Sequence, residues 1–385
     1  MPPRLRIGYF LAPYPEGGLA RHVLALIDRM RERYSVVVFC DRRQETFQDA
    51  LKQRELTPHV IANRPTAKKG ILRPILESCG PMIEARRAFR AERLDIVHFH
   101  AGRLGAIYPA IVASRWTGIP TRLLTVHNQV LRRSPLQRLF EARVLGSLDA
   151  IVAVGAEVKG ELMEKKNVTA DKISVIVNGI ELTEFDTLEP MEKIRAELGV
   201  DSTASVLGVV GRLHYDKGID LLIRAVALLK PRYSQFRAVI IGSGPDEAAL
   251  KGLAETEGVG DIIHFAGYRA DARRLMPALD MIAMPSRRDA QPFALLEAMA
   301  ARRAVVAAAV GGIPGILIDG VTGVLFPSEN VNALAAALEK LLKDPGQRKA
   351  LGEAARQRVK KEFSESAMIE KTAALYEEAA AGKTD

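Results

Sequence analysis

The 385-residue sequence predicts an α/β chain that folds into two doubly wound, Rossmann-like domains, each built on a parallel sheet. Short runs rich in Val and Ile alternate with amphipathic stretches, which is typical of strand and helix units around parallel sheets. The length exceeds what one hydrophobic core usually organises. With 48% hydrophobic and 26% charged residues, the composition is that of a compact globular protein.

The first domain is expected to span residues 1–178. Its six strand-like runs lie at 4–11, 35–40, 96–100, 122–127, 150–154 and 173–177. The segment VNGIELTEF then leads into a polar, acidic stretch that ends near Pro190. We expect the hinge between the domains in this stretch.

The second domain is expected to span residues 179–363. Its strand-like runs lie at 206–210, 238–241, 262–266, 281–285, 304–309 and 323–326. Residues 364–381 carry apolar side chains at helical spacing with no strand after them. Residues 364–385 are therefore expected to form a terminal helix.

Other bulk features disfavour several classes of protein. Cys40 and Cys79 are too few for a disulfide framework and lack the spacing of a zinc site, so we expect a reducing, cytoplasmic setting. The first residues hold a short apolar run interrupted by proline, which favours a buried strand over a signal peptide or membrane span. No short-period repeat or heptad array indicates a solenoid or fibre.

Positive charge is concentrated in the first half of the chain. Residues 1–180 hold 29 Lys and Arg against 17 Asp and Glu, a net charge of +12, whereas the whole chain has +9. Such a half could attract anionic lipid, phosphorylated acceptors or nucleic acid, or it could only favour solubility. Nucleic acid is disfavoured because no aromatic residues are interleaved with the charge.

Three strand ends carry turns that could contact a ligand. Gly17 and Gly18 stand where the first strand must turn into a helix, and glycine lets the backbone approach a phosphate or acceptor group closely. Packing alone explains many such glycine pairs. Gly242 opens the turn GSGP of the second domain, and Tyr268 with Arg269 could form a wall for a nucleotide base.

Two cations follow the first strand of the second domain. The segment VVGRLHYDKG places Arg212 and Lys217 just past a carboxyl strand end, the edge at which open parallel sheets bind ligands. Two cations five residues apart can clamp a diphosphate. The alternative interpretation is a solvated basic loop.

The stretch DMIAMPSRRDAQPFALLEAMA is the most informative one. A polar loop carries Asp289, Pro292 begins a helix, and Glu297 lies one turn into that helix. Amides at the helix start can hold a diphosphate or sugar hydroxyls, while Glu297 can accept hydrogen bonds from ribose. These amides belong to Phe293, Ala294 and Leu295. A buried carboxylate without a partner would be costly, which disfavours a purely structural Glu297.

In order and spacing, these motifs resemble a retaining glycosyltransferase of family 4, over essentially the whole chain. The motifs are GGLARHV, VHN, VNGI, GRLHYDKG, GSGP, the helix ending in LLEAMA, VGGIPG and DGVTGVLF. The resemblance implies the GT-B fold, in which two Rossmann-like domains face a central cleft and the terminal helix packs back on the first domain. It implies transfer of a hexose or N-acetylhexosamine from a nucleotide diphosphate sugar, UDP-sugars before GDP-mannose, to a lipid-linked, polysaccharide or glycolipid acceptor.

The resemblance also implies which residues bind the donor nucleotide. Arg212 and Lys217 would grip the diphosphate and neutralise the leaving group. Glu297 would hold the ribose, and Gly18 would approach the phosphates.

Near the reacting carbon, the resemblance implies that His127 holds a donor-sugar hydroxyl or aligns the acceptor. Asp289 and the helix amides would face the donor sugar. A histidine at a strand end is often only a structural hydrogen-bonding residue. The chemistry would rely on electrostatic stabilisation, with no cofactor and no metal.

The sequence departs from the family pattern at several positions. Asp289 replaces the first Glu of the usual Glu-x7-Glu pair, and Ala294 replaces a glycine. After LLEAMA a small residue, Gly and Pro are common where this chain has Arg302, Arg303 and Ala304, and Gly315 stands where Glu is common. We therefore expect an active enzyme with altered donor-sugar contacts.

Two other functions stay open. The departures favour a non-catalytic, nucleotide-binding scaffold, which Arg212, Lys217, Glu297 and His127 oppose. A sugar-nucleotide epimerase with the same fold is less favoured, because the motifs are those of transferases. For the basic half we expect loose attachment to the inner face of an anionic membrane. The residues expected to contact that membrane are Lys68, Lys69, Arg73, Arg86, Arg87, Arg90, Arg93, Arg132 and Arg133.

Overall fold

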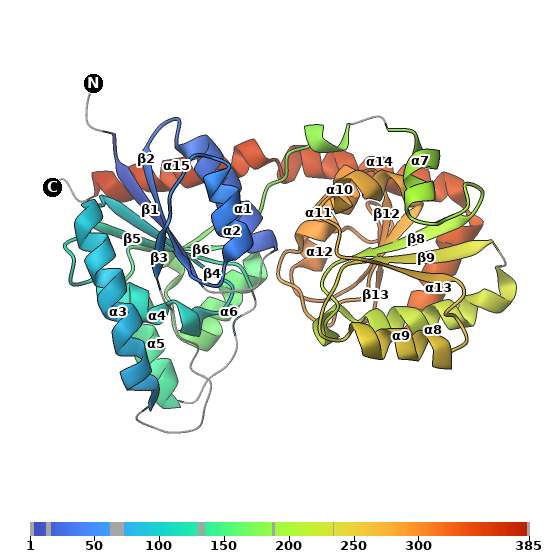
Figure 1. Cartoon of the computed structure of the whole chain (residues 1–385), viewed down its shortest axis with the longest axis horizontal. Helices are drawn as coiled ribbons and strands as arrows, with labels where there is room; N and C mark the ends of the chain where they lie inside the picture. The colour runs from blue at the N-terminus through green and yellow to red at the C-terminus, as the bar shows by residue number, and fades with distance from the viewer. Residues whose placement is uncertain are drawn as a thin grey trace. The chain divides into compact units, whose positions relative to one another are not determined.

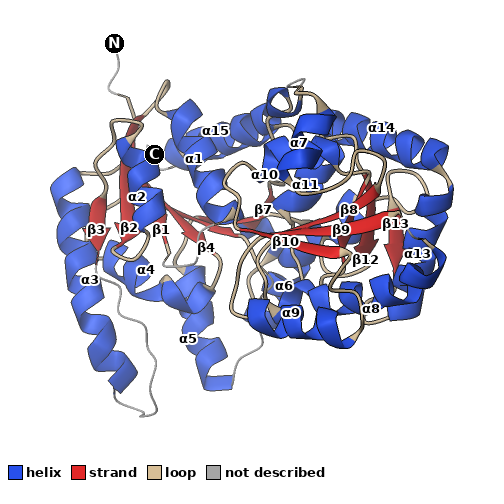
Figure 2. Cartoon of the chain, turned by 45° about the vertical axis from the view of Figure 1, so that its right-hand side comes forward, coloured by secondary structure: helices blue, strands red, loops and turns tan. Residues whose placement is uncertain are grey.

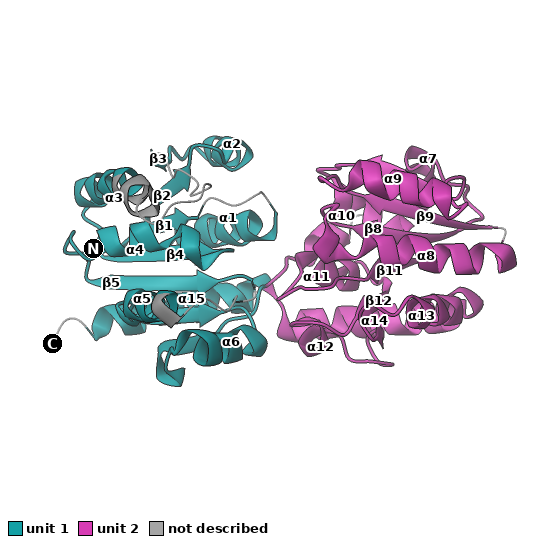
Figure 3. Ribbon diagram, turned by 90° about the horizontal axis from the view of Figure 1, so that it is seen from below, with its two compact units in different colours: residues 1–178, 365–385 teal, residues 179–364 magenta. Residues whose placement is uncertain are grey.

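The structure, a computed structural model, describes residues 4–12, 17–61, 73–128, 130, 135–186, 189–233 and 235–382; at 73–79 and 135–136 it describes only the backbone. The chain divides into two compact units (Figure 3). The first unit consists of Met1–Asn178 and Glu365–Asp385, and the second of Gly179–Ser364.

The first unit contains a seven-stranded parallel sheet in the order β3-β2-β1-β4-β5-β6-β7. Its strands are β1 (Arg6–Leu11), β2 (Ser35–Asp41), β3 (His59–Ile61), β4 (Ile96–Ala101), β5 (Thr121–Val126), β6 (Ala150–Ala153) and β7 (Ile173–Val175). Its helices are α1 (Gly18–Met30), α2 (Glu45–Lys52), α3 (Arg73–Glu92), α4 (Tyr108–Ser114), α5 (Pro135–Gly146), α6 (Ala156–Lys166) and α15 (Glu365–Ala381). The strands are mostly apolar because helices cover both faces of the sheet (Figure 2).

The terminal helix α15 is part of the first unit and lies beside α1 (Figure 1). Both helices bury their apolar stripes against β1 and its neighbours, in a core that includes Leu26, Ile27, Met368 and Tyr376. Residues 365–381 therefore form the helix expected from their spacing, and it completes the core of a domain whose other residues lie far away in sequence.

The second unit contains a six-stranded parallel sheet in the order β10-β9-β8-β11-β12-β13. Its strands are β8 (Ser205–Val210), β9 (Phe236–Ile241), β10 (Ile263–Gly267), β11 (Met281–Met284), β12 (Ala304–Ala308) and β13 (Val324–Phe326). Its helices are α7 (Met191–Glu197), α8 (Ile219–Leu229), α9 (Glu247–Thr256), α10 (Ala272–Leu275), α11 (Phe293–Ala300), α12 (Ile313–Ile316), α13 (Val331–Lys343) and α14 (Pro345–Glu362). Helices α8, α9 and α13 pack on one face of this sheet.

Short 3-10 helices join several of these elements. They are η1 (Leu104–Ala106), η2 (Ala170–Lys172), η3 (Thr183–Phe185), η4 (Tyr215–Lys217), η5 (Lys230–Arg232) and η6 (Met276–Ala278). In the described part of the chain, no helix combines the length and the apolar composition needed to cross a bilayer.

All twelve strands predicted from the sequence are present, with ends that differ by at most two residues. The prediction missed β3, which has only three residues and lies at the edge of its sheet. The apolar residues of this strand are only Val60 and Ile61, and two residues are too short a run to be detected. Pro292, expected to begin a helix, is instead the N-cap residue of α11.

Candidate functional site

The strand order of the second unit places a switch point between β8 and β11. The chain runs outward from β8 to β10, then crosses back and runs outward on the other side from β11 to β13. Ligands of open parallel sheets bind outside the carboxyl ends of the strands at such a point. The loops after β8 and β11 therefore form a candidate site, and they carry Arg212, Lys217 and Asp289.

Lys217 and Asp289 meet across this switch point. The Lys217 ammonium group donates a hydrogen bond to the Asp289 carboxylate over 2.5 Å, and the Asp289 side chain is 12% exposed. Arg212, on the same loop as Lys217, is exposed and has no hydrogen-bond or ion-pair partner within the described ranges. The site thus offers one paired cation and one uncommitted guanidinium group.

Close backbone approach holds the loops of this site together. A Cβ atom on Gly218 would lie 1.9 Å from the carbonyl oxygen of Pro285, and one on Gly242 would lie 1.8 Å from that of Gly211. Gly218 also has a φ of +63°, which L side chains rarely adopt. Gly242 was predicted to bind the donor through its turn, and the structure gives it this packing role as well.

Arg287, which the sequence did not single out, fixes the β8 and β11 loops together. Its guanidinium group donates to both carboxylate oxygens of Asp220 over 2.7 Å and lies 4.1 Å from the ring centroid of Tyr215. Its backbone amide donates to the carbonyl of Asp216 over 2.8 Å. Hydrogen bonding to Asp220 raises the pKa of Arg287, so the guanidinium group that links the two loops stays charged.

Helix α11 begins at the end of the β11 loop with two open amides. No side chain caps this helix, and the amides of Phe293 and Ala294 have no hydrogen-bond partner among the described residues. The amide of Leu295 is occupied, because it donates to the carbonyl of Pro292 over 3.1 Å. Two of the three predicted amides can therefore bind an anion.

Glu297 is buried on α11 and has a cationic partner. Its carboxylate accepts a hydrogen bond of 2.9 Å from Arg273 Nε, and Arg273 also pairs with Glu184. The pair explains how a carboxylate can be buried in an apolar helix. Arg273 was not predicted, and it fixes the orientation of the group expected to hold the ribose.

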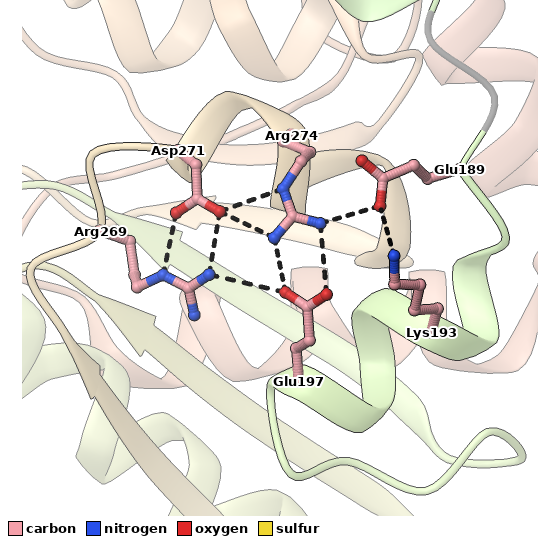
Figure 4. Close-up of polar contacts among 6 residues, drawn as sticks. All are labelled: Glu189, Lys193, Glu197, Arg269, Asp271 and Arg274. Carbon is pink, nitrogen blue, oxygen red and sulfur yellow. Dashed lines mark hydrogen bonds and ion pairs between the residues drawn. The ribbon is translucent and has the colours of Figure 1, made fainter.

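Tyr268 and Arg269 follow β10 but differ in their surroundings. The Tyr268 side chain is exposed, with 70% of its surface accessible. Arg269 donates to Asp271 over 2.9 Å and lies 3.7 Å from Glu197, within the network of ion pairs in Figure 4. Hydrogen bonds from Arg269 hold the pKa of Asp271 well below its usual range. Of the two, Tyr268 is the side chain free to stack on a base.

In the first unit, the switch point lies between β1 and β4. Gly17 precedes α1 with a φ of +156°, and Gly18 is the first residue of that helix. A Cβ atom on Gly17 would contact no atom within 4 Å, so backbone conformation rather than space favours glycine there. The preceding residues of the motif, 13–16, lie outside the described residues.

His127 lies at the same sheet edge, inside a group of four buried histidines. His22 comes from α1, His98 and His100 from β4, and His127 from the end of β5. His100 Nδ1 and His127 Nε2 lie 3.2 Å apart, and the rings of His22 and His127 meet edge-on with centroids 4.6 Å apart. The structure thus brings His127 together with three histidines whose role the sequence did not indicate.

Burial keeps these imidazoles neutral. It lowers the pKa of His22 to about 4 and that of His98 to about 3, and it lowers the pKa values of His100 and His127 well below the ordinary value. A neutral imidazole can donate one hydrogen bond and accept another. This state suits the predicted contact between His127 and a sugar hydroxyl.

Three of the histidines could also hold a metal ion. One ring nitrogen from each of His22, His100 and His127 lies within 4.8 Å of the others, the one such set that the described residues form. Neutral imidazole is the usual nitrogen ligand of zinc and other transition metals. The expectation that the chemistry needs no metal stays a prediction.

The departure at Arg302 and Arg303 lies away from the candidate site. Arg302 and Arg303 precede β12 and thus stand at the amino end of the sheet, opposite the ligand edge. Arg303 donates hydrogen bonds to the backbone carbonyls of Pro277 and Leu279, so its guanidinium group has a structural role. Gly315, in α12, would meet no atom within 4 Å if it carried a Cβ, so the structure leaves room there for a side chain.

Two of the residues that the sequence analysis missed, His98 and His100, carried a readable signal. In HFH, His98 and His100 are two positions apart on a predicted strand, so they point to the same face of the sheet. Polar residues that repeat with this period inside an apolar strand indicate a shared buried site. Arg273 and Arg287 gave no such signal, because their partners lie elsewhere in the chain.

Two family descriptions match this chain. Residues 16–184 match "Glycosyltransferase Family 4", and residues 190–358 match "Glycosyl transferases group 1". A D-inositol 3-phosphate glycosyltransferase of Kineococcus radiotolerans is 30% identical over 94% of this chain and 91% of its own length. An alpha-D-kanosaminyltransferase of Streptomyces kanamyceticus is 27% identical over 77% of this chain and 81% of its own.

Solved structures have the same fold. HepE of Anabaena, crystallised with UDP, superposes with a TM-score of 0.83 at 20% identity, over 97% of this chain and 100% of its own. A glycosyltransferase of Rickettsia africae superposes with a TM-score of 0.83 at 23% identity, over 98% of both chains. WaaG, a glycosyltransferase of lipopolysaccharide biosynthesis, gives 0.73 at 19% identity, over 96% of this chain and 99% of its own.

Proposed function

Since the chain belongs to glycosyltransferase family 4 and has the GT-B fold, we propose that it transfers a hexose or N-acetylhexosamine from a nucleotide diphosphate sugar with retention of configuration. We propose a UDP-sugar before GDP-mannose, a choice supported by the UDP bound in HepE. The acceptor would be a lipid-linked glycan, a polysaccharide or a glycolipid. The observation that carries the proposal is the meeting of Lys217 and Asp289, with Arg212 uncommitted, at the β8–β11 switch point.

Arg212 and Lys217 would act on the leaving diphosphate. As the bond between the anomeric carbon and the phosphate oxygen breaks, negative charge develops on that oxygen. Arg212 can bind it through a planar fork and Lys217 as a point charge, and the open amides of α11 add two donors. These fixed charges supply what a metal ion would otherwise supply, so we propose a reaction without one.

Asp289 and Glu297 would orient the donor. Lys217 can bind a phosphate oxygen while it keeps its contact with Asp289, which leaves that carboxylate beside the donor sugar. Arg273 fixes the Glu297 carboxylate, which would accept hydrogen bonds from the ribose. In the transfer step, the acceptor hydroxyl attacks the face that the diphosphate leaves, a bond to the anomeric carbon forms, and the leaving phosphate takes the proton.

A panel of nucleotides tests the donor proposal. UDP or a UDP-sugar is expected to raise the melting temperature of the protein, with no change when EDTA is added. A ligand at a free concentration of about 100 times its Kd stabilises a protein by roughly 2.7 kcal/mol, which raises Tm by several degrees. The measurement is thermal unfolding with UDP, GDP, ADP, CMP and their sugar conjugates.

The Glu297→Gln variant provides the specificity control for that panel. It keeps the shape of the side chain but loses the charge, so the shift caused by the nucleotide should shrink. Arg232→Ala, which removes an exposed ion pair with Glu339 in the same unit, should leave the shift unchanged. A protein that no nucleotide stabilises would contradict the donor site.

We also propose that the basic first unit binds anionic membrane. Arg87, Arg90 and Arg93 are exposed at the end of α3, and Arg86 lies 6.0 Å from the ring of Trp116. The same unit also exposes large apolar side chains, and cations together with exposed apolar groups are typical of surfaces at the membrane interface. The exposed apolar residues are Ile83, Trp116, Leu139 and Phe140. Of the other predicted contacts, Lys68, Lys69, Arg132 and Arg133 lie outside the described residues, and Arg73 is described only in its backbone.

Sedimentation with liposomes tests the membrane proposal. Binding is expected to increase with the fraction of anionic lipid and to weaken as salt is raised, since each Lys or Arg near such a surface contributes about 1 kcal/mol. The triple variant R87A/R90A/R93A should lower the partition coefficient on the order of a hundredfold. Equal binding to neutral and anionic vesicles would contradict the proposal.

A further inference from the structure

A chain of hydrogen bonds joins the terminal helix to the histidine group of the first unit. The Tyr376 hydroxyl, on α15, lies 2.7 Å from His98 Nδ1 and donates to the Tyr9 hydroxyl over 3.1 Å. His98 Nε2 lies 2.7 Å from the Thr125 hydroxyl. Tyr376, Tyr9, His98 and Thr125 are all buried, so every member depends on its protein partners for hydrogen bonding.

The chain engages both ring nitrogens of His98. Nδ1 is bound to the Tyr376 hydroxyl and Nε2 to the Thr125 hydroxyl, so one nitrogen of the neutral ring donates and the other accepts. Burial raises the pKa of Tyr376 and lowers that of His98, so both stay neutral. Both contacts therefore hold the orientation of the His98 ring.

His98 in turn packs against the pair that contains His127. The ring centroids of His98 and His100 are 4.1 Å apart, and His100 Nδ1 lies 3.2 Å from His127 Nε2. The ring of Tyr9 also contacts both, 6.1 Å from His98 and 5.9 Å from His100. A rotation of His98 would therefore displace His100 and, through it, His127.

From this geometry we propose that Tyr376 is a positioning residue for His127. Its hydroxyl fixes His98, His98 fixes His100 by packing, and His100 fixes the ring that contacts the donor sugar or acceptor. The role of His127 rests on the proposed function, whereas the link from Tyr376 to His127 does not. The terminal helix thus contributes to the site as well as to the core.

The variant Tyr376→Phe tests this proposal, because it removes only the hydroxyl and keeps the buried ring. Tyr34→Phe is the matched control: the Tyr34 hydroxyl binds Glu377 of the same helix over 3.2 Å, and it has no hydrogen bond to the histidines. Two measurements are needed. One is the kcat and donor KM of transfer, and the other is the nitrogen-15 spectrum of the histidine rings, which reports each tautomer without any substrate.

Tyr376→Phe is expected to lower kcat on the order of tenfold with an unchanged donor KM, and to shift the ring resonances of His98, His100 and His127. Tyr34→Phe should change neither kcat nor these resonances. If Tyr376→Phe does not fold, Thr125→Val removes the other hydrogen bond of His98 and should shift the same resonances.

The proposal is overturned if the His127 resonances are the same in Tyr376→Phe as in the wild type, or if kcat falls equally in both tyrosine variants. If the wild-type protein transfers no sugar, the proposed function fails. The ring spectra alone then decide whether Tyr376 positions His127.

Discussion

Replacing Lys217 by alanine is expected to lower kcat for sugar transfer by about a thousandfold. The substitution removes a cation that would neutralise the leaving diphosphate. It also leaves the Asp289 carboxylate, which is 12% exposed, without its partner at 2.5 Å, so that a negative charge faces the phosphates. Steady-state kinetics with the donor found in the nucleotide panel measures the effect.

Lys230→Ala is the control for this loss. Lys230 lies in the same unit and pairs with Asp261 over 2.5 Å, but it follows α8 and stands away from the carboxyl ends of β8 and β11. Its removal should change kcat by less than about threefold, as for other surface ion pairs. A Lys217→Ala enzyme whose kcat stays within tenfold of the wild type would show that leaving-group stabilisation lies elsewhere.

The second large effect is a loss of stability in the first unit as the pH falls below about 6.5. The pKa values of His22, His98, His100 and His127 are lower in the folded chain than the ordinary value near 6.5. The unfolded chain therefore binds more protons in this range, so stability is complete above 6.5 and decreases as pH falls toward about 4. Each histidine contributes on the order of 1.4 kcal/mol per pH unit.

Denaturant unfolding between pH 7.5 and 5.0 measures this loss. The fluorescence of Trp116, the one tryptophan of the chain, reports on the first unit. His22→Gln should reduce the dependence on pH by about one proton, because it removes one of the four groups. Equal stability at pH 7.5 and 5.0 would contradict the neutral state of the buried histidines.

The strands of both sheets could be predicted because each one is a local pattern. Central strands such as β8 and β11 are buried on both faces, so their residues form continuous apolar runs that are visible without any knowledge of the partners. The short edge strand β3 has no such run and was missed. The motif order was also sufficient to identify the family, because it depends on the sequence alone.

The candidate site could be predicted in part. Arg212, Lys217 and Asp289 follow strands directly, and the carboxyl ends of parallel strands share one edge, so their grouping follows from strand position. Three hydrogen-bonded pairs could not be predicted: Glu297 with Arg273, Arg287 with Asp220, and Arg269 with Asp271. Such contacts depend on side-chain directions that only the folded loops define.

The sequence by itself determined the two parallel sheets, the ligand edge of each and the cations that stand there, since these depend on hydrophobic runs and on position relative to strand ends. Only the tertiary structure decided which buried polar groups become partners. His98 and Tyr376 are 278 residues apart and meet at 2.7 Å because α15 returns to the first unit. No local pattern encodes that meeting, because it results from the packing of two elements that are remote in the chain.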